Sequence, residues 1–234
     1  MPASSGGVFL LNLAPQKNYG IEMNSKVRVL EAYKVVPVIQ ISSLEQVKPL
    51  AEQLIVNDLP VAEVTLRTKP ALASLEVFAK EFPELLLIAG TVLNSQQARS
   101  ASNAGASMIV SPGFNPQTIS YCLNNDLDVI PGAMTPGEME QALDLGLKTL
   151  KFFPAEAAGG INMLKSVSAP YKDLRFMPTG GIHPANVNDY LALSSVICCG
   201  GSWMVDPKLM ATHDWPEVGR LIRHARALTN NIAD

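Results

Sequence analysis

The sequence predicts an α/β protein, a single-domain (β/α)8 barrel of the TIM type, and two observations support this fold class. From Val35 onward, apolar runs of strand length alternate with segments of helical length that mix polar and apolar residues. Alternating strands and helices imply a parallel sheet. The pattern also repeats eight times. Eight repeats fit a closed barrel at the compact end of that fold's size range, about 200 residues.

An open, doubly wound sheet is the alternative arrangement of such a pattern. That fold would place a glycine-rich dinucleotide turn directly after the first strand. Residues 40–44 read Gln-Ile-Ser-Ser-Leu and contain no glycine. The barrel is therefore the favoured prediction.

The expected elements follow one another from residue 35 to residue 229. The expected strands are Val35–Ile41, Val61–Leu66, Leu85–Ala89, Ser107–Val110, Asp128–Ile130, Thr149–Phe153, Arg175–Met177 and Val196–Cys199. The expected helices cover residues 44–57, 69–81, 95–104, 116–125, 136–145, 161–168, 184–192 and 215–229. Asn115 and Thr135 each precede a proline, which places a capping side chain before a proline at the first helical position. Asn94 or Ser95 is expected to cap the helix at 95–104.

We expect the barrel to span residues 31–234, with residues 1–30 forming an extension outside the main fold. The apolar stretch at residues 8–13 is short and follows no basic segment, so it is not typical of a secretory signal. Met23 is an alternative start of the chain. No apolar run approaches the roughly 20 residues of a membrane helix, and we expect no membrane association.

Composition narrows the functional class further. Hydrophobic residues make up 47% of the chain and charged residues 17%, which is typical of a globular protein with a large core. A net charge of −3 gives no sign of a surface for nucleic acid. The chain has three cysteines, two of them adjacent, which does not indicate a disulfide framework. A cytoplasmic protein is therefore expected.

Lys151 is the candidate nucleophile, because it lies inside an apolar strand segment, residues 149–154. Both faces of a strand in a parallel barrel are covered, so this lysine is expected to be buried. Burial disfavours the ammonium form, as an amine nucleophile requires. Phe153 shares the face of Lys151 because strand side chains alternate, and its ring would help to exclude water. The alternative is a structural lysine paired with a buried carboxylate.

The second predicted strand supplies an acid and an arginine. Glu63, Thr65 and Arg67 alternate with apolar neighbours and therefore share one face. Glu63 lies in the strand interior and is suited to shuttling protons. Arg67, at the strand's end, is suited to a two-pronged contact with a carboxylate. The alternative is a Glu63–Lys151 ion pair that only fills the core.

Glycine pairs follow the seventh and eighth predicted strands. Residues 178–181 read Pro-Thr-Gly-Gly, and residues 200–203 read Gly-Gly-Ser-Trp. Phosphate-binding barrels bring backbone N–H groups to the anion at these two strand ends. We therefore predict a phosphate site there. Small residues at 89–91 and 111–113 are expected to leave room for a ligand.

The sequence predicts no metal site and no cofactor. Metal-dependent chemistry would need clustered histidine or carboxylate ligands. His213 and His224 lie at or after the start of the last helix, and His183 follows a glycine turn. No phosphate-binding loop or dinucleotide fingerprint is present.

These motifs together resemble the bacterial 2-keto-3-deoxy-6-phosphogluconate (KDPG) aldolases. The resemblance runs from about Val35 to Val205 and includes the runs at residues 63–67, 89–92, 111–113, 151–156, 178–181 and 200–203. Gln40 is a departure, because some relatives carry a basic residue at the end of the first strand.

The resemblance implies cleavage of KDPG to pyruvate and glyceraldehyde 3-phosphate in the Entner–Doudoroff pathway. Many such enzymes also cleave 4-hydroxy-2-oxoglutarate (KHG) to pyruvate and glyoxylate. It implies a metal-free homotrimer in which Lys151 forms the Schiff base and Glu63 is the acid–base residue. By motif, the pyruvate pocket comprises Arg67, Thr91, Pro112 and Phe153. The phosphate end comprises Thr179, Gly180, Gly181, Gly201 and Ser202.

Two other functions stay open on the residues alone. One is a phosphate-binding barrel with isomerase or synthase chemistry, in which Lys151 acts only electrostatically. The other is a barrel that binds a phosphorylated metabolite without turnover. Borohydride trapping of a Schiff base separates the first from an aldolase, and an assay for released pyruvate separates the second.

Overall fold

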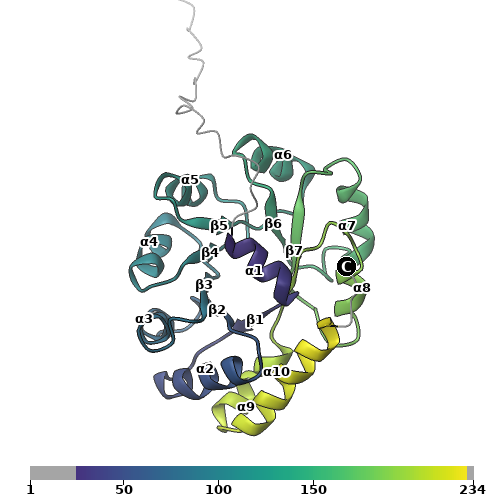
Figure 1. The fold of residues 1–234 in the computed structure, drawn as a ribbon. Helices are drawn as coiled ribbons and strands as arrows, with labels where there is room; N and C mark the ends of the chain where they lie inside the picture. Colours follow the sequence, from purple (N-terminus) through teal and green to yellow (C-terminus); the bar gives the residue numbers. More distant parts are fainter. Residues whose placement is uncertain (1–24, 231–234) are drawn as a thin grey trace, which may run out of the picture.

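The structure is a computed structural model and describes residues 25–230, so the features expected at residues 1–24 lie outside the described residues. Parallel strands occupy the centre, and helices surround them (Figure 1). One sheet has six strands in the order β5-β4-β3-β2-β1-β8, and β6 and β7 form a second sheet. The strands are β1 Val35–Ile39, β2 Val61–Thr65, β3 Leu86–Gly90, β4 Met108–Val110, β5 Asp128–Ile130, β6 Thr149–Phe152, β7 Arg175–Pro178 and β8 Cys199–Gly201.

Isolated parallel bridges connect the two sheets. Gly132 pairs with Lys151 on one side, while Phe176 pairs with Val196 and Thr179 with Gly200 on the other. The predicted α/β fold with parallel strands is therefore confirmed. Strand β8 begins later than the expected residue 196, because Val196 makes only an isolated bridge and the ladder with β1 starts at Cys199.

Helices follow the strands as the sequence predicts, with two additions. The α-helices are α1 Ser25–Tyr33, α2 Val47–Val56, α3 Ala71–Glu81, α4 Ser95–Asn103, α5 Pro116–Asn124, α6 Pro136–Asp144, α7 Gly160–Ser168, α8 Val187–Leu191, α9 Pro207–Ala211 and α10 Trp215–Asn230. Helices α1 and α9 are not among the predicted elements. Short 3-10 turns cover Leu44–Gln46 and Trp203–Val205. Asn94, Asn115 and Thr135 cap their helices with side-chain oxygens, which confirms these start signals.

Helix α1 crosses the middle of the strand assembly (Figure 1). It buries Val27 and Leu30 against inward-facing strand residues such as Ile88 and Met177. Lys26 Nζ donates to Asp128 Oδ2 at 2.6 Å, at the first residue of β5. The helix therefore closes the amino-terminal ends of the strands. The expected boundary between residues 30 and 31 falls inside it.

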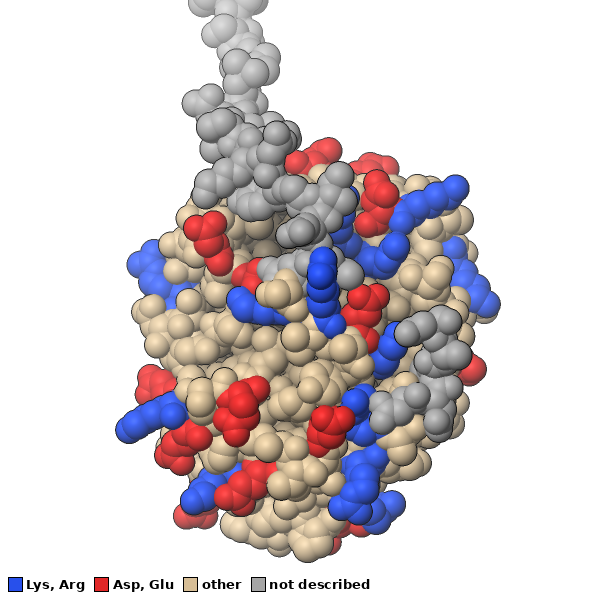
Figure 2. All heavy atoms as spheres, in the orientation of Figure 1, with Lys and Arg blue, Asp and Glu red and all other residues tan. Residues whose placement is uncertain are grey.

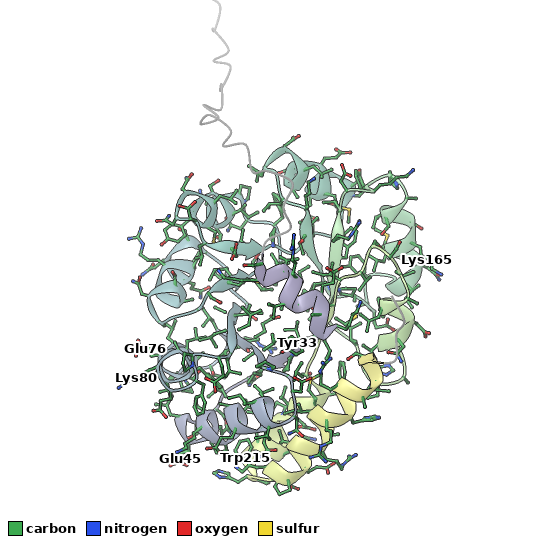
Figure 3. All side chains as sticks on the ribbon, viewed as in Figure 1. Tyr33, Glu45, Glu76, Lys80, Lys165 and Trp215 are labelled. Carbon is green, nitrogen blue, oxygen red and sulfur yellow. The ribbon has the colours of Figure 1, made fainter. Side chains whose placement is uncertain are left out.

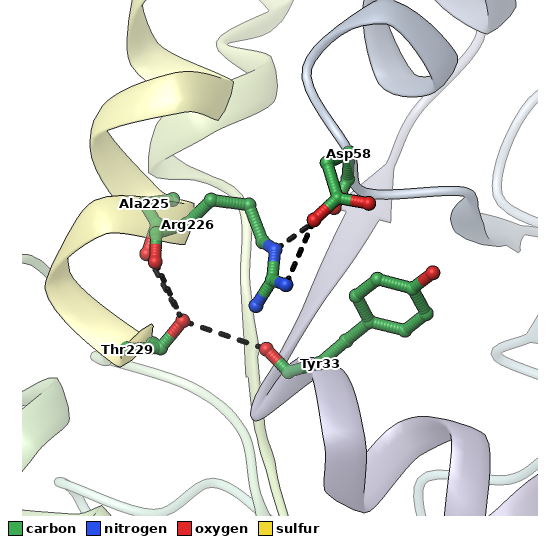
Figure 4. Close-up of polar contacts among 5 residues, drawn as sticks. All are labelled: Tyr33, Asp58, Ala225, Arg226 and Thr229. Atoms are coloured by element: carbon green, nitrogen blue, oxygen red, sulfur yellow. Dashed lines mark hydrogen bonds and ion pairs between the residues drawn. The ribbon is translucent and has the colours of Figure 1, made fainter. Parts of the chain in front are cut away.

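Side chains of helix α10 contact this closed end of the strand assembly (Figure 4). Arg226 Nη2 lies 3.0 Å from Asp58 Oδ2, and its guanidinium lies 4.9 Å from the ring centroid of Tyr33. The Thr229 hydroxyl donates to the carbonyl of Tyr33 at 3.5 Å. These contacts join α10, α1 and the loop before β2. The carboxyl ends of the strands are free of this network.

No helix in the described part of the chain is long and apolar enough to cross a membrane. Acidic and basic side chains are interspersed over the face that carries α1, and no field of one sign covers it (Figure 2). This distribution agrees with the small net charge of −3.

We expect the buried thiol of Cys122, on α5, to make the folded protein less stable at alkaline pH. Burial raises the pKa of this thiol from 9.0 to about 11. Between these two values the unfolded chain releases the thiol proton and the folded protein keeps it. The free energy of unfolding should therefore fall as pH rises through this window, with a slope of up to about 1.4 kcal/mol per pH unit from this group.

Urea unfolding of the wild type and of Cys122→Ala, at about pH 8.5 and about pH 10.5, measures this contribution. The other groups that titrate in this range are common to both proteins. The wild type should lose more stability than the variant over the interval. Equal losses in the two proteins would refute the role of Cys122.

Candidate active site

The centre of the candidate site is a buried ion pair between β6 and β2. Lys151 Nζ donates to Glu63 Oε1 at 3.0 Å. The lysine is 4% exposed and the glutamate 0%, so water does not screen the pair. Strand alternation turns both side chains inward, as the sequence predicts. The structure thus brings together the two residues predicted to carry the chemistry.

One oxygen of this pair lacks a partner. Glu63 Oε2 is buried and accepts no hydrogen bond from any residue that the structure describes. Buried polar atoms in folded proteins nearly always have a partner. Glu63 therefore keeps one lone-pair site for a group that enters the interior.

Gly90, the last residue of β3, makes room for the glutamate. A Cβ at this position would lie 2.4 Å from Glu63 Oε1 and 2.7 Å from its Cγ. The sequence predicts that the small residues at 89–91 leave room for a ligand. The space at Gly90 is instead filled by the side chain of Glu63, which only a residue without Cβ allows.

Phe153 connects the lysine to the glycine turn after β7. Lys151 Nζ lies 5.6 Å from the centroid of the Phe153 ring. The same ring packs on Gly180, where a Cβ would lie 3.3 Å from two ring carbons. The half-buried ring therefore lies beside both the amine and the glycine turn, on the face that the sequence predicts.

The turn after β7 exposes consecutive glycines with left-handed backbones. Gly180 has φ 98° and Gly181 has φ 81°, which side chains with a Cβ rarely adopt. Glu156 packs on Gly181, and its N–H donates to the carbonyl of Gly180 at 3.1 Å. The Tyr190 hydroxyl donates to Glu156 Oε1. Burial and this hydrogen bond raise the pKa of Tyr190 well above its usual range, so it stays a donor.

The turns after β7 and β8 lie side by side. Thr179 forms a parallel bridge with Gly200 and is 6% exposed. Gly201 ends β8, where it pairs with Pro37 of β1. Ser202 follows as an exposed residue whose hydroxyl makes no hydrogen bond within residues 25–230. The two predicted phosphate turns are therefore neighbours.

Three further predicted residues lie on the loops after β2, β3 and β4. Arg67 is exposed and makes no ion pair with any residue placed by the structure. Thr91 has a left-handed φ of 59°, a strained conformation that is frequent at functional sites. The carbonyl of Pro112 packs on Gly132, the bridge partner of Lys151. No hydrogen bond or ion pair in the described chain joins Arg67 or Thr91 to the lysine.

The described residues offer no cluster of side chains that could bind a metal ion. Among residues 25–230, no group of three or more histidine, cysteine or acidic side chains has a geometry suited to a metal ion. His183 lies on the loop after the glycine turn and is exposed.

Comparison with known proteins identifies the family. The family model of KDPG and KHG aldolases matches residues 27–221. The chain belongs to this aldolase family. It is 42% identical over 194 residues to the 2-dehydro-3-deoxy-phosphogluconate aldolase of Haemophilus influenzae, covering 83% of this chain and 92% of that protein. It is 43% identical over 197 residues to the KHG/KDPG aldolase of Escherichia coli, covering 84% and 92%.

Solved structures of KDPG aldolases agree with this assignment. The enzyme from Legionella pneumophila, crystallised with pyruvate captured as a covalent carbinolamine, superposes with a TM-score of 0.84 at 39% identity. The comparison covers 86% of this chain and 98% of that one. The enzyme from Zymomonas mobilis with 3-phosphoglycerate has a TM-score of 0.82 at 36% identity, covering 87% and 96%.

Sequence reasoning missed several residues that shape the site of this aldolase family member. Gly90 leaves space for the Glu63 side chain, and Gly132, the bridge partner of Lys151, packs on the backbone of Pro112, where a Cβ would clash. A glycine gives no chemical signal of such a role. Glu156 and Tyr190 brace the glycine turn. Glu156 belongs to the motif at residues 151–156, but its hydrogen-bond partner Tyr190 lies on a helix 34 positions further along the chain.

Gly90→Ala is expected to lower kcat by about tenfold or more, because the added methyl displaces the Glu63 carboxylate from Lys151. Steady-state kinetics with circular dichroism measures activity and folding together. Gly137→Ala is the matched control, because a Cβ at this helical position meets nothing within 4 Å. Equal activity in both variants would show that Glu63 needs no such space.

Proposed function

We propose that this protein is a class I aldolase that cleaves KDPG through a Schiff base on Lys151. One observation carries the proposal: a lysine that is 4% exposed has its ammonium 3.0 Å from a fully buried glutamate. A Schiff-base enzyme needs an amine shielded from water with a proton acceptor in reach. The covalent pyruvate carbinolamine of the Legionella relative supports the same chemistry.

A purely structural ion pair explains the geometry less well. Removing two charges from water costs several kcal/mol, which the pair offsets only when its remaining lone pairs also have partners. Glu63 Oε2 has no partner within the described residues. The buried Lys151–Glu63 pair with its unpartnered oxygen is therefore better explained by a site that binds a polar substrate than by an ion pair that only fills the core.

The first half of the reaction builds the iminium. Lys151 gives its proton to Glu63, and the free amine adds to the C2 carbonyl of the substrate to form a carbinolamine. Glu63 returns a proton to the C2 hydroxyl, which leaves as water. The product is a protonated imine between Nζ and C2, and its positive charge lies beside the Glu63 carboxylate.

The second half breaks the carbon chain. Glu63, directly or through one water, removes the C4 hydroxyl proton as the C3–C4 bond breaks and glyceraldehyde 3-phosphate leaves. The bonding electrons enter the iminium, which becomes a neutral enamine. Protonation of C3 and hydrolysis of the imine then release pyruvate and restore Lys151.

The ends of the substrate define the rest of the site. Arg67, which has no ion-pair partner among the described residues, is proposed to bind the carboxylate, in a pocket with Thr91, Pro112 and Phe153. The distal phosphate is proposed to bind at Thr179, Gly180, Gly181, Gly201 and Ser202. Binding there would position the reacting carbons.

The wider organisation is part of the same proposal. We propose that the strands close as a (β/α)8 barrel within a single domain over residues 31–234, to which residues 25–30 of α1 add. The bridges between the two sheets support closure. A cytoplasmic homotrimer is also proposed. Three buried free thiols support a reducing location.

A coupled assay with lactate dehydrogenase tests the function directly. Addition of KDPG should release pyruvate in equal amount to glyceraldehyde 3-phosphate, and chelators should not affect the rate. KHG should be tested beside it, because the similar E. coli protein is a KHG/KDPG aldolase. Binding of KDPG without pyruvate release would refute the proposal.

Tyr190→Phe should raise the KM for KDPG by about threefold to tenfold and leave kcat for KHG unchanged, because the hydroxyl braces Glu156 and the phosphate turn. Tyr171→Phe is the matched control, since Tyr171 donates to Glu140 at 2.9 Å away from the site. Equal KM values in the two variants, or a parallel fall with both substrates, would contradict this role.

A further inference from the structure

A groove with three basic side chains lies at the end of the molecule opposite to the phosphate turns. It has a volume of about 420 Å³ and is lined by the end of α7, the loop that follows and the start of β7. Lys165, Lys172 and Arg175 contribute its charges. Arg175 is the first residue of β7, whereas the glycine turn follows the last residue of that strand. The groove is therefore separate from the candidate active site.

Within residues 25–230, none of these three cations forms an ion pair. No carboxylate lines the groove. Arg175 Nη1 donates to the carbonyls of Lys172 and Leu174 at 3.1 and 3.3 Å, which orients the guanidinium and leaves its other N–H groups available. Glu140, at the edge, accepts a hydrogen bond from the lining residue Tyr171. Three uncompensated cations make a local positive field on a chain of net charge −3.

The other wall of the groove supplies neutral donors. The backbone N–H groups of Ser194 and Ser195 make no hydrogen bond in the described chain, and the Ser194 hydroxyl makes none either. Leu174 and Leu193 add apolar surface between the polar groups. Backbone amides without a partner, beside cationic side chains, are suited to binding phosphate oxygens. Apolar surface beside them suits a carbon skeleton.

We propose that this groove binds a small phosphorylated metabolite at a second site, away from the reaction. A phosphate monoester matches three cations better than a carboxylate does, because it carries close to two charges and three acceptor oxygens at neutral pH. The volume of about 420 Å³ is within the range of small-ligand sites. This proposal does not depend on the aldolase reaction.

Nitrogen-15 NMR of the full chain tests the site, with inorganic phosphate and 3-phosphoglycerate as probes at constant ionic strength. The amides of Ser194 and Ser195 should shift and saturate. The double variant Lys165→Gln and Lys172→Gln should weaken this binding by about tenfold or more. The control is Lys48→Gln with Lys80→Gln, which removes the same charge from α2 and α3. Figure 3 shows Lys165 on α7 and Lys80 on the other side of the molecule.

The outcomes separate clearly. Unchanged binding in the control and loss in the groove variant support the site. Absence of saturable shifts in the wild type overturns it, as does equal weakening in both double variants. Glycerate that binds as tightly as 3-phosphoglycerate would overturn the assignment to phosphate. Turnover of KDPG should be the same in both double variants. The binding result can therefore be interpreted even if the aldolase assay shows no activity.

Discussion

Lys151→Met is expected to lower kcat for KDPG by at least about 10⁴-fold, because methionine fills a similar volume but cannot form an imine. No other lysine is expected to replace it, since among residues 25–230 only the Lys151 amine forms an ion pair with the proposed proton partner Glu63, at 3.0 Å. Single-turnover assays with the variant in excess over substrate set the upper limit of the residual rate.

A control is needed because the variant leaves a buried glutamate without its cation. Such a loss typically destabilises a protein by about 3–5 kcal/mol. Combining Lys151→Met with Glu63→Gln removes the unpaired charge and should restore much of the stability without restoring turnover. Activity above about 1% of wild type in the stable double variant would remove Lys151 from the reaction.

Glu63→Gln is expected to lower kcat by about 10²- to 10³-fold, the usual contribution of a positioned acid–base group. The amide keeps the shape and still accepts a hydrogen bond from Lys151, but it cannot carry a proton between steps. Pyruvate should still form an imine on Lys151 at equilibrium, only more slowly. Stopped-flow kinetics and mass spectrometry after reduction measure the two effects separately.

Glu156→Gln is the matched control for this substitution. It makes the same chemical change at a carboxylate that contacts Tyr190 and Gly181 and that forms no hydrogen bond or ion pair with Lys151 in the described chain. It should affect KM for KDPG more than kcat. A fall in kcat of less than about threefold in Glu63→Gln would show that another group moves the protons.

The strands and the central ion pair were predictable because they depend on simple periodicities. Alternation of side chains along a strand places Glu63 and Lys151 in the interior once the segments are recognised as neighbours in a barrel. The caps at Asn115 and Thr135 were predictable because a polar oxygen before a proline has a local physical meaning. These features need only a few adjacent residues to be read.

Other features depend on contacts between distant segments. Helix α1 is nine residues long, with Val27 and Leu30 as its buried residues, so its periodicity is too short to distinguish it from an extension. The need for Gly90 becomes visible only when the Glu63 side chain is placed beside it. The groove around Arg175 joins two loops that are about 20 positions apart in the chain.

Reduction with borohydride in the presence of pyruvate tests the central claim most directly. The imine between pyruvate and the enzyme would become a stable secondary amine, and peptide mass spectrometry would locate it. We expect a single added pyruvate-derived mass on Lys151, dependent on both pyruvate and borohydride. An unmodified Lys151 in enzyme that cleaves KDPG, or the same mass on another lysine, would contradict the assignment of the Schiff base to this residue.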